Sequence, residues 1–225
     1  MSAFPTAAAA TASAAATAAA AATKSARTLL ILDLNGCLMT RLNHQEFQLA
    51  RKSGYPLPAK VGTVAKKPVF MRPHAIEFVR YVQAMPELDV AVWTSATAKN
   101  AATLIDMVLG SKTYSQFKFV WGREKCTPVQ NEETPWATIK VDLGAIYKAF
   151  PDYTPERTLI VDDSLYKARL NAANALVLPS FDLINPLAAP MADTVLLDLA
   201  AYLRLLVRVN PPDVRKYIHA NPFSI

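Results

Sequence analysis

An apolar run that ends in an acid, TLLILD at residues 28–33, constrains the fold more than any other feature of the chain. A run without alternating polar residues is typical of a strand buried on both faces, as in parallel sheets. Similar runs occur at residues 89–93, 158–161 and 175–178. Helical patterns come between and after these runs, at residues 73–84, 98–109, 142–150, 194–207 and 211–219. This alternation predicts an α/β fold with a parallel sheet flanked by helices.

The first 26 residues differ in composition from the rest of the chain. They are rich in alanine, serine and threonine and contain no acid. We interpret residues 1–26 as a low-complexity tail, disordered or loosely helical, with an organelle transit peptide as the alternative. The basic residues Lys24 and Arg27 follow the alanine run instead of preceding it, which argues against a secretory signal. Residues 27–225 have the length of one domain with a full core.

Charge and cysteine content exclude several classes of protein. The chain has 24 basic and 18 acidic residues, and the excess is spread out, so it is weak evidence for direct nucleic-acid binding. Two cysteines and three scattered histidines make neither a disulfide framework nor a zinc site. No stretch of about 18 strongly apolar residues predicts a membrane span. We expect an intracellular, reducing compartment, nuclear or cytoplasmic, with mitochondria as the alternative.

Polar residues stand where three of the predicted strands end. Asp33 ends the first strand, Thr94 follows the second, and the Asp162–Asp163 pair ends the third. Because ligands of open α/β sheets bind beyond the carboxyl ends of the strands, we expect these side chains to meet. Each alone has an ordinary explanation as a cap or turn residue. Together with Lys140 they predict a site for phosphoryl chemistry.

The chemistry of this set can be assigned residue by residue. A carboxylate such as Asp33 can attack phosphorus and become an aspartyl phosphate. Carboxylates gathered in one place repel one another unless a cation joins them, and their hard oxygens favour Mg²⁺. The Thr94 hydroxyl and the Lys140 ammonium can hold the remaining phosphoryl oxygens. Asp33, Asp162 and Asp163 are therefore the predicted side-chain ligands of Mg²⁺.

Several short motifs resemble those of one family. DLNGCL at residues 33–38 is similar to the D-x-D-x-T-L motif of the haloacid dehalogenase (HAD) superfamily. Within it, the chain resembles the NLI-interacting-factor-like branch, which contains small CTD phosphatases and FCP-type phosphatases. The further matching segments are MRPHAIEF at 71–78, VWTSA at 92–96, REKC at 123–126, KVDL at 140–143 and DDS at 162–164. The resemblance covers residues 28–220.

The resemblance implies an HAD-like fold with a minimal cap and a function in removing phosphate from phosphoserine or phosphothreonine in proteins. It implies that Arg72, Ser95 and Arg123 bind substrate and that the main-chain carbonyl of Asn35 is a further Mg²⁺ ligand. The only stretches available for a cap are residues 39–69, which are polar and broken by glycine and proline, and residues 111–138, for which we expect a small hairpin. Neither can seal the site, so an extended peptide can enter.

Asn35 departs from the family pattern. Active members carry a second aspartate at this position, which protonates the leaving group and activates water. Asparagine does neither at neutral pH, and loss of a general acid–base typically costs about 10²- to 10⁴-fold in rate. The sequence therefore predicts a slow phosphatase. The alternative is a pseudo-phosphatase that binds phosphopeptides or presequences as an adaptor.

Two further resemblances bear on these alternatives. The branch includes a phosphatase-like receptor subunit of the mitochondrial inner-membrane presequence translocase, whose C-terminal region resembles VLLDL at 195–199 and DVR at 213–215. A two-component receiver domain also uses Asp, Thr, Lys and Mg²⁺. We rank it last, because its acidic pair lies on the first strand, whereas Asp162 and Asp163 come late in this chain.

Overall fold

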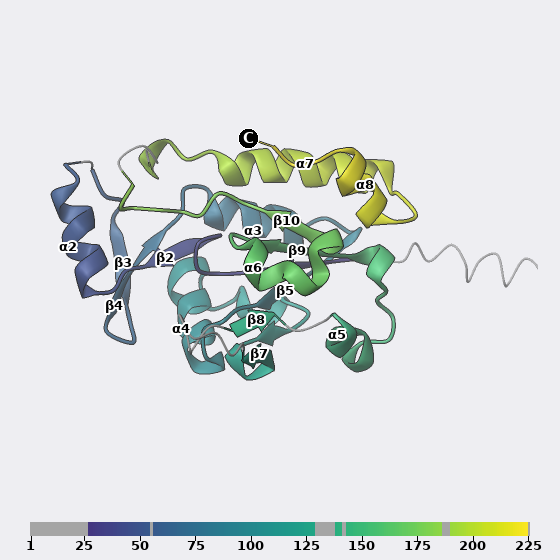
Figure 1. The fold of residues 1–225 in the computed structure, drawn as a ribbon, viewed down its shortest axis with the longest axis horizontal. Helices are drawn as coiled ribbons and strands as arrows, with labels where there is room; N and C mark the ends of the chain where they lie inside the picture. The colour runs from purple at the N-terminus through teal and green to yellow at the C-terminus, as the bar shows by residue number, and fades with distance from the viewer. Residues whose placement is uncertain (1–26, 55, 129–137, 141–142, 186–189, 225) are drawn as a thin grey trace, which may run out of the picture.

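A computed structural model of the chain describes residues 27–54, 56–128, 138–140, 143–185 and 190–224. Its centre is a sheet in which every pairing is parallel, with the strand order β10-β9-β1-β5-β6 (Figure 1). The strands are β1 (Thr28–Leu32), β5 (Leu88–Trp93), β6 (Val120–Trp121), β9 (Thr158–Asp162) and β10 (Ala175–Val177). All residues of β1 and β9 are buried. The predicted α/β fold with a parallel sheet is confirmed.

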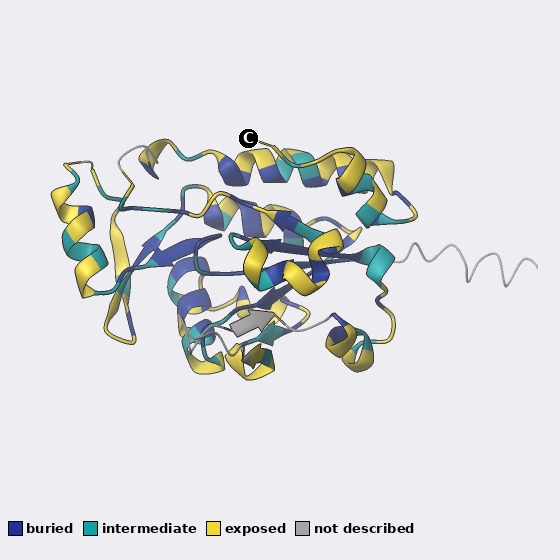
Figure 2. Ribbon diagram, in the orientation of Figure 1, coloured by how far each residue is buried: buried dark blue, intermediate teal, exposed yellow. Residues whose placement is uncertain are grey.

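Helices cover both faces of this sheet, and the side chains of β1 show how the faces divide. Leu30 and Leu32 pack into a large apolar cluster with helices α3, α4, α7 and α8. Leu29 and Ile31 point to the opposite face, toward α5, because successive strand residues alternate in direction. The helix bounds are α3 (Ala75–Gln83), α4 (Ala98–Leu109), α5 (Gly144–Ala149), α6 (Leu165–Ala168), α7 (Val195–Val209) and α8 (Val214–Ala220). Figure 2 shows the central strands of the sheet, such as β1 and β9, as buried and the outer helix faces as exposed.

The predicted elements and the observed ones agree closely in position. The helix expected at 98–109 has those bounds, with Thr97 as its N-cap and Gly110 as its C-cap. The helix expected at 73–84 begins two residues later, because Pro73 and His74 form the turn before it. Short 3₁₀ turns complete the chain: η1 (Tyr114–Gln116), η2 (Arg123–Lys125), η3 (Pro155–Arg157), η4 (Arg169–Asn174) and η6 (Pro190–Ala192).

The segment between β1 and α3 forms an antiparallel sheet of its own, which the sequence did not predict. Its strands are β2 (Met39–Arg41), β3 (Lys60–Val64) and β4 (Lys67–Met71), in the order β2-β4-β3. Ala65 and Lys66 turn the β3–β4 hairpin with positive φ angles of 50° and 62°, as two-residue hairpin turns require. The segment also contains α2 (His44–Lys52), which begins with a capping box of Asn43 and Glu46. This small unit lies beside the central sheet (Figure 1).

The hairpin expected within residues 111–138 is present. Its second strand ends two residues beyond that range, at Lys140. The strands β7 (Cys126–Pro128) and β8 (Thr138–Lys140) pair antiparallel, and β8 lies against α6. The residues that join them lie outside the described part of the chain, as does the tail predicted at residues 1–26. Among the described helices, none is both long and apolar enough to span a bilayer.

Candidate active site

The predicted site residues gather at the carboxyl ends of β1, β5 and β9. Asp33 directly follows β1, and its N–H donates to the Val161 carbonyl of β9 at 2.9 Å. Thr94 directly follows β5, and its N–H donates to the Trp121 carbonyl of β6 at 2.9 Å. The ladder of the sheet therefore fixes where both side chains begin. Asp33, Thr94 and Asp162 are all buried.

Three carboxylates form the centre of the site. Oxygen atoms of Asp33, Asp162 and Asp163 lie within 4.8 Å of one another. Asp162 ends β9 and accepts the Ser164 N–H at 2.9 Å, while Asp163 accepts the Ser180 hydroxyl at 2.8 Å. Asp33 is 1% exposed and Asp162 0%. Gathering three acids in the interior is unfavourable without positive charge between them.

The donor set fits a small divalent cation. Carboxylate oxygens are ligands that Mg²⁺ prefers, and Asp33, Asp162 and Asp163 can turn three of them to one point. Gly36, at a φ of 90°, lets Asp163 approach, since a Cβ on this residue would collide with the Asp163 carboxylate. These three aspartates would hold Mg²⁺, as the sequence predicts.

Replacing either aspartate of the late pair should weaken metal binding. We expect Asp162→Ala and Asp163→Ala each to lower Mg²⁺ affinity by about tenfold or more, because each removes one charged ligand. Isothermal titration calorimetry with Mg²⁺ measures the effect. Asp106→Ala, on the exposed face of α4, is the matched control and should bind as wild type does. Unchanged affinity in both site variants would show that the metal binds elsewhere.

Lys167 is a site residue that the sequence analysis missed. Its Nζ lies 3.3 Å from Asp163 Oδ1, 3.6 Å from Asp33 Oδ2 and 4.0 Å from Asp162 Oδ1. Burial acts to lower the pKa of this ammonium, but attraction by the three aspartates outweighs burial and raises it above its usual value. The available signal was its short spacing from Asp163, four residues earlier, just before the N-cap of α6.

The Asn35 side chain is held by a backbone N–H that donates to its amide oxygen. Its Oδ1 accepts the N–H of Arg41 at 3.0 Å, next to the bridge between Asn35 and Met39. An aspartate can make the same bond, because one carboxylate oxygen replaces the amide oxygen. The second oxygen would then stand where the Asn35 amide nitrogen stands now. The substitution therefore preserves the loop while removing an ionisable group.

Arg72 lies in the interior and not at the mouth of the site. It is 0% exposed, and its guanidinium donates to both Asp193 oxygens, at 2.8 to 3.1 Å, and to the carbonyls of Gly36, Cys37 and Pro179, at 3.0 to 3.3 Å. A residue so enclosed makes no contact with an entering substrate. The structure therefore corrects the predicted substrate-binding role of Arg72: it holds the loop that follows Asp33.

Loss of the Arg72 guanidinium should destabilise the fold strongly. We expect Arg72→Met to lower the free energy of unfolding by about 3–5 kcal/mol, because the Asp193 side chain, 10% exposed, would lose its partner. Urea denaturation followed by circular dichroism measures the change. Arg80→Met, at an exposed position of α3, serves as the control. A loss no larger than that of the control would contradict the clamping role.

Ser95 and Arg123 are connected at the rim of the site. The Arg123 Nε donates to the Ser95 carbonyl at 2.8 Å, and the Arg123 N–H donates to the Ala96 carbonyl at 2.7 Å. Arg123 is exposed and Ser95 partly exposed, so both remain accessible to a substrate. Their predicted role in substrate binding is compatible with this position.

Arg41, on β2, is a second basic residue that the sequence analysis missed. Burial lowers the pKa of its guanidinium first of all; Arg123 lowers it further, and Asp33 raises it. Arg41 therefore lies close enough to Arg123 and to Asp33 for their charges to shift its pKa. Its Nε is buried without a hydrogen-bond partner. Arg41 is therefore a candidate cation for a phosphate bound near Asp33.

Lys140 is placed by its backbone alone. It pairs with Cys126 in the β7–β8 hairpin, and the hairpin strand that contains it lies against α6. That position brings the residue to the side of the site where Lys167 and Asp163 lie. The Lys140 side chain lies outside the described part of the structure, so its role in holding phosphate stays a prediction.

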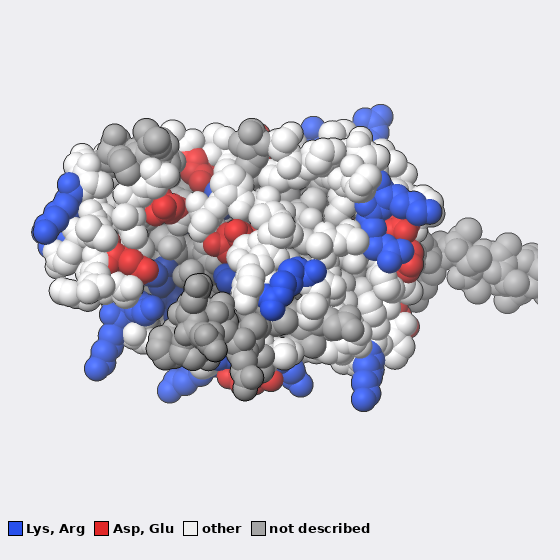
Figure 3. All heavy atoms as spheres, viewed as in Figure 1, with Lys and Arg blue, Asp and Glu red and all other residues white. Residues whose placement is uncertain are grey.

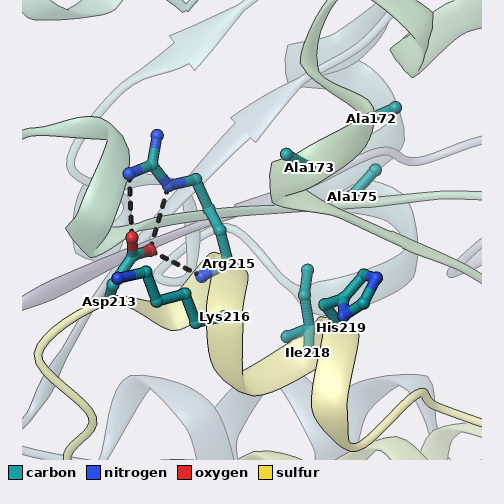
Figure 4. Close-up of a pocket in the computed structure, with 8 residues that line it drawn as sticks. All are labelled: Ala172, Ala173, Ala175, Asp213, Arg215, Lys216, Ile218 and His219. Atoms are coloured by element: carbon teal, nitrogen blue, oxygen red, sulfur yellow. Dashed lines mark hydrogen bonds and ion pairs between the residues drawn. The ribbon is translucent and has the colours of Figure 1, made fainter.

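The face of the molecule in Figure 3 has no single sign of charge. On the face shown in Figure 3, acidic and basic side chains are interspersed. A separate hollow of about 570 Å³ lies between η4 and α8, and none of the predicted site residues lines it (Figure 4). Its Arg215 is bound to Asp213 and also to Glu156. We therefore assign the chemistry to the aspartate cluster and not to this hollow.

Comparison with known proteins identifies the family. The model of the family described as NLI interacting factor-like phosphatase matches residues 28–215. No curated protein matches the chain. Similar solved structures include the RNA polymerase II CTD phosphatase of fission yeast bound to beryllium fluoride, with 15% identity and a TM-score of 0.46. That match covers 88% of this chain and 56% of the yeast protein, so the chain spans little more than half of that relative.

Two other solved structures come from HAD-like hydrolases. A haloacid dehalogenase-like family protein from Streptococcus pneumoniae is 13% identical, covers 79% of this chain and 99% of its own, and has a TM-score of 0.47. A phospho-aspartyl intermediate analogue of phosphoserine phosphatase is also 13% identical, with coverages of 74% and 91% and a TM-score of 0.39.

Proposed function

We propose that this chain, which belongs to the NLI interacting factor-like phosphatase family, is a slow Mg²⁺-dependent phosphoprotein phosphatase that acts through an aspartyl phosphate. The observation that carries the proposal is the cluster of Asp33, Asp162 and Asp163 at the carboxyl ends of β1 and β9. Family membership supports phosphatase chemistry in general. The serine/threonine specificity, the metal and the reduced rate are our proposals.

The residues divide the reaction between them. An Asp33 oxygen attacks phosphorus, the bond from phosphorus to the leaving oxygen breaks, and an aspartyl phosphate forms. The leaving oxygen takes its proton from water, because Asn35 cannot donate one. The hydroxide that remains takes a proton from a second water as that water attacks phosphorus, the bond from phosphorus to the Asp33 oxygen breaks, and orthophosphate leaves. Bound Mg²⁺ would supply the positive charge that lets an anionic phosphate approach the carboxylates.

Cations and hydroxyls of the chain hold the phosphate. Thr94 directly follows β5, the strand that pairs with β1. Its hydroxyl can donate to a phosphoryl oxygen. Arg123, in η2 at the rim, and the partly buried Arg41, at the end of β2, attract a dianion. Lys140 completes the set if its side chain follows the direction expected from its motif. A phosphorylated protein segment is the proposed substrate.

Turnover of p-nitrophenyl phosphate tests the function. We expect slow hydrolysis that depends on Mg²⁺ and stops when EDTA removes the metal. A phosphoserine peptide should then compete with the chromogenic substrate. If neither wild type nor Asn35→Asp hydrolyses either substrate although Mg²⁺ binds, the phosphatase proposal fails.

A second function is favoured by Asn35 itself. The amide at this position removes the proton-transfer group and leaves phosphate-binding residues such as Thr94 and Arg123 in place. A domain of this kind can bind a phosphopeptide or a presequence without releasing product, as an adaptor does. Binding of a phosphopeptide with no turnover, in wild type and in Asn35→Asp, would favour this function over the first.

A further inference from the structure

We propose that Lys167 is a tethered cation, an ammonium group that occupies the metal position of the aspartate cluster and that Mg²⁺ must displace. The inference rests on the proposed function only in that the metal is Mg²⁺. Nζ of Lys167 is the centre of three ion pairs, at 3.3, 3.6 and 4.0 Å, to Asp163, Asp33 and Asp162. These are the three residues whose oxygens can hold a metal.

The two cations cannot occupy the cluster together. Mg²⁺ binds carboxylate oxygens at about 2.0–2.1 Å, and the oxygens of Asp33, Asp162 and Asp163 lie within 4.8 Å of one another. Nζ of Lys167 lies 3.3 to 4.0 Å from one oxygen of each of these carboxylates, so an ion bound to the same three oxygens would lie within about 5.4 Å of Nζ. Two positive charges at such a distance repel strongly in a buried site. Entry of the metal therefore requires that the ammonium leave.

The Lys167 ammonium can leave the aspartate cluster toward solvent. The Lys167 side chain is 26% exposed, whereas Asp33 is 1% exposed, so Lys167 lies on the solvent side of the nucleophile. Its four-carbon stem has several rotatable bonds, so Nζ can move while the backbone of α6 stays in place. The backbone is fixed by Ser164, whose hydroxyl accepts the Lys167 N–H at 3.4 Å as the N-cap of α6.

The net charge of the aspartate cluster favours exchange of the Lys167 ammonium for Mg²⁺ over permanent binding of the ammonium. Three carboxylates against one ammonium leave two negative charges, which still attract a divalent ion. Each Mg²⁺ that binds must nevertheless break the ion pairs of Lys167, so this residue lowers the affinity for the metal. Lys167 is also ion-paired with Asp33 at 3.6 Å, so entry of the metal frees this carboxylate from the ammonium. Lys167 thus couples metal binding to opening of the site.

Metal titration of Lys167 variants tests the proposal. Lys167→Met removes the charge and keeps the length, and we expect it to bind Mg²⁺ about tenfold more tightly or better by isothermal titration calorimetry. Lys167→Arg keeps the charge and should stay near wild type. Lys112→Met is the control, since it lies just beyond the far end of α4, whose N-terminus faces the site. Equal or weaker binding by Lys167→Met overturns the proposal.

Two additions keep the test decisive. Without metal, Lys167→Met leaves three facing carboxylates, so its Tm should fall, and Mg²⁺ should raise its Tm more than that of wild type. If Lys167→Met does not fold even with Mg²⁺, Lys167→Gln decides by the same titration. The outcome is independent of turnover: tighter Mg²⁺ binding by Lys167→Met, together with no hydrolysis by either wild type or Asn35→Asp, supports the tethered cation and rejects the phosphatase. Mg²⁺-dependent turnover with unchanged affinity in these variants does the reverse.

Discussion

Asn35→Asp should raise kcat by about 10²-fold or more and change KM little. The Asn35 amide oxygen accepts the Arg41 N–H at 3.0 Å, and a carboxylate oxygen can take over that bond. The loop then stays as it is, and the second oxygen becomes a proton donor and acceptor at residue 35. Phosphate binding depends on other groups, among them Thr94 and Arg123. Affinity and turnover should therefore separate, because the substitution acts on one step alone.

Steady-state hydrolysis of p-nitrophenyl phosphate at saturating Mg²⁺ measures both constants. Asn221→Asp, the same chemical change at the exposed C-cap of α8, is the matched control and should leave them unchanged. If wild type already turns over as fast as Asn35→Asp, another group supplies the proton, with Asp163 or water as candidates. An Asn35→Asp variant that binds Mg²⁺ and stays inactive favours the adaptor function.

The parallel sheet was predictable because its strands are buried on both faces. The residues of β1 and β9 need no polar alternation, and a run such as TLLIL differs visibly from its surroundings. The antiparallel sheet β2-β4-β3 was missed for the opposite reason. Its strand β3 is largely exposed and contains Gly62, so no apolar pattern marks it. The turn at Ala65 and Lys66 uses positive φ angles without a glycine, which removes the usual sign of a hairpin.

The site was predictable where a residue directly follows a strand. Asp33, Thr94 and Asp162 have their places fixed by the ladder of the sheet. Arg72 was assigned to the substrate on the family resemblance alone. Its anion is Asp193, more than one hundred residues away in the chain, and no local pattern reveals that partner. Lys167 was missed because a lysine in a short helix resembles a solvated one until the fold brings it to Asp33.

Asp33→Asn, made in the Asn35→Asp background, should reduce kcat by about 10³-fold or more. The faster background is needed because a loss from a slow wild type would be difficult to measure. Asp33 follows β1 and lies at the floor of the site, 1% exposed, with its backbone held by Val161 of β9. An amide in this place is a poor nucleophile for phosphorus, so no aspartyl phosphate can form. Beryllium fluoride, which mimics a phosphoryl group on a carboxylate, should no longer inhibit the variant.

The nearby acids make the control for this variant important. Asp33→Asn also removes one negative charge from the cluster, which weakens Mg²⁺ binding, so the assay must be repeated at several Mg²⁺ concentrations. Asp198→Asn, on the exposed side of α7, removes one charge at a distance and should keep full activity. A nucleophile defect persists at every Mg²⁺ concentration, whereas a defect of metal affinity recovers as Mg²⁺ increases. Recovery to the full rate would reject Asp33 as the nucleophile and leave it as a metal ligand alone, because the attacking group would then have to be water or another carboxylate of the cluster.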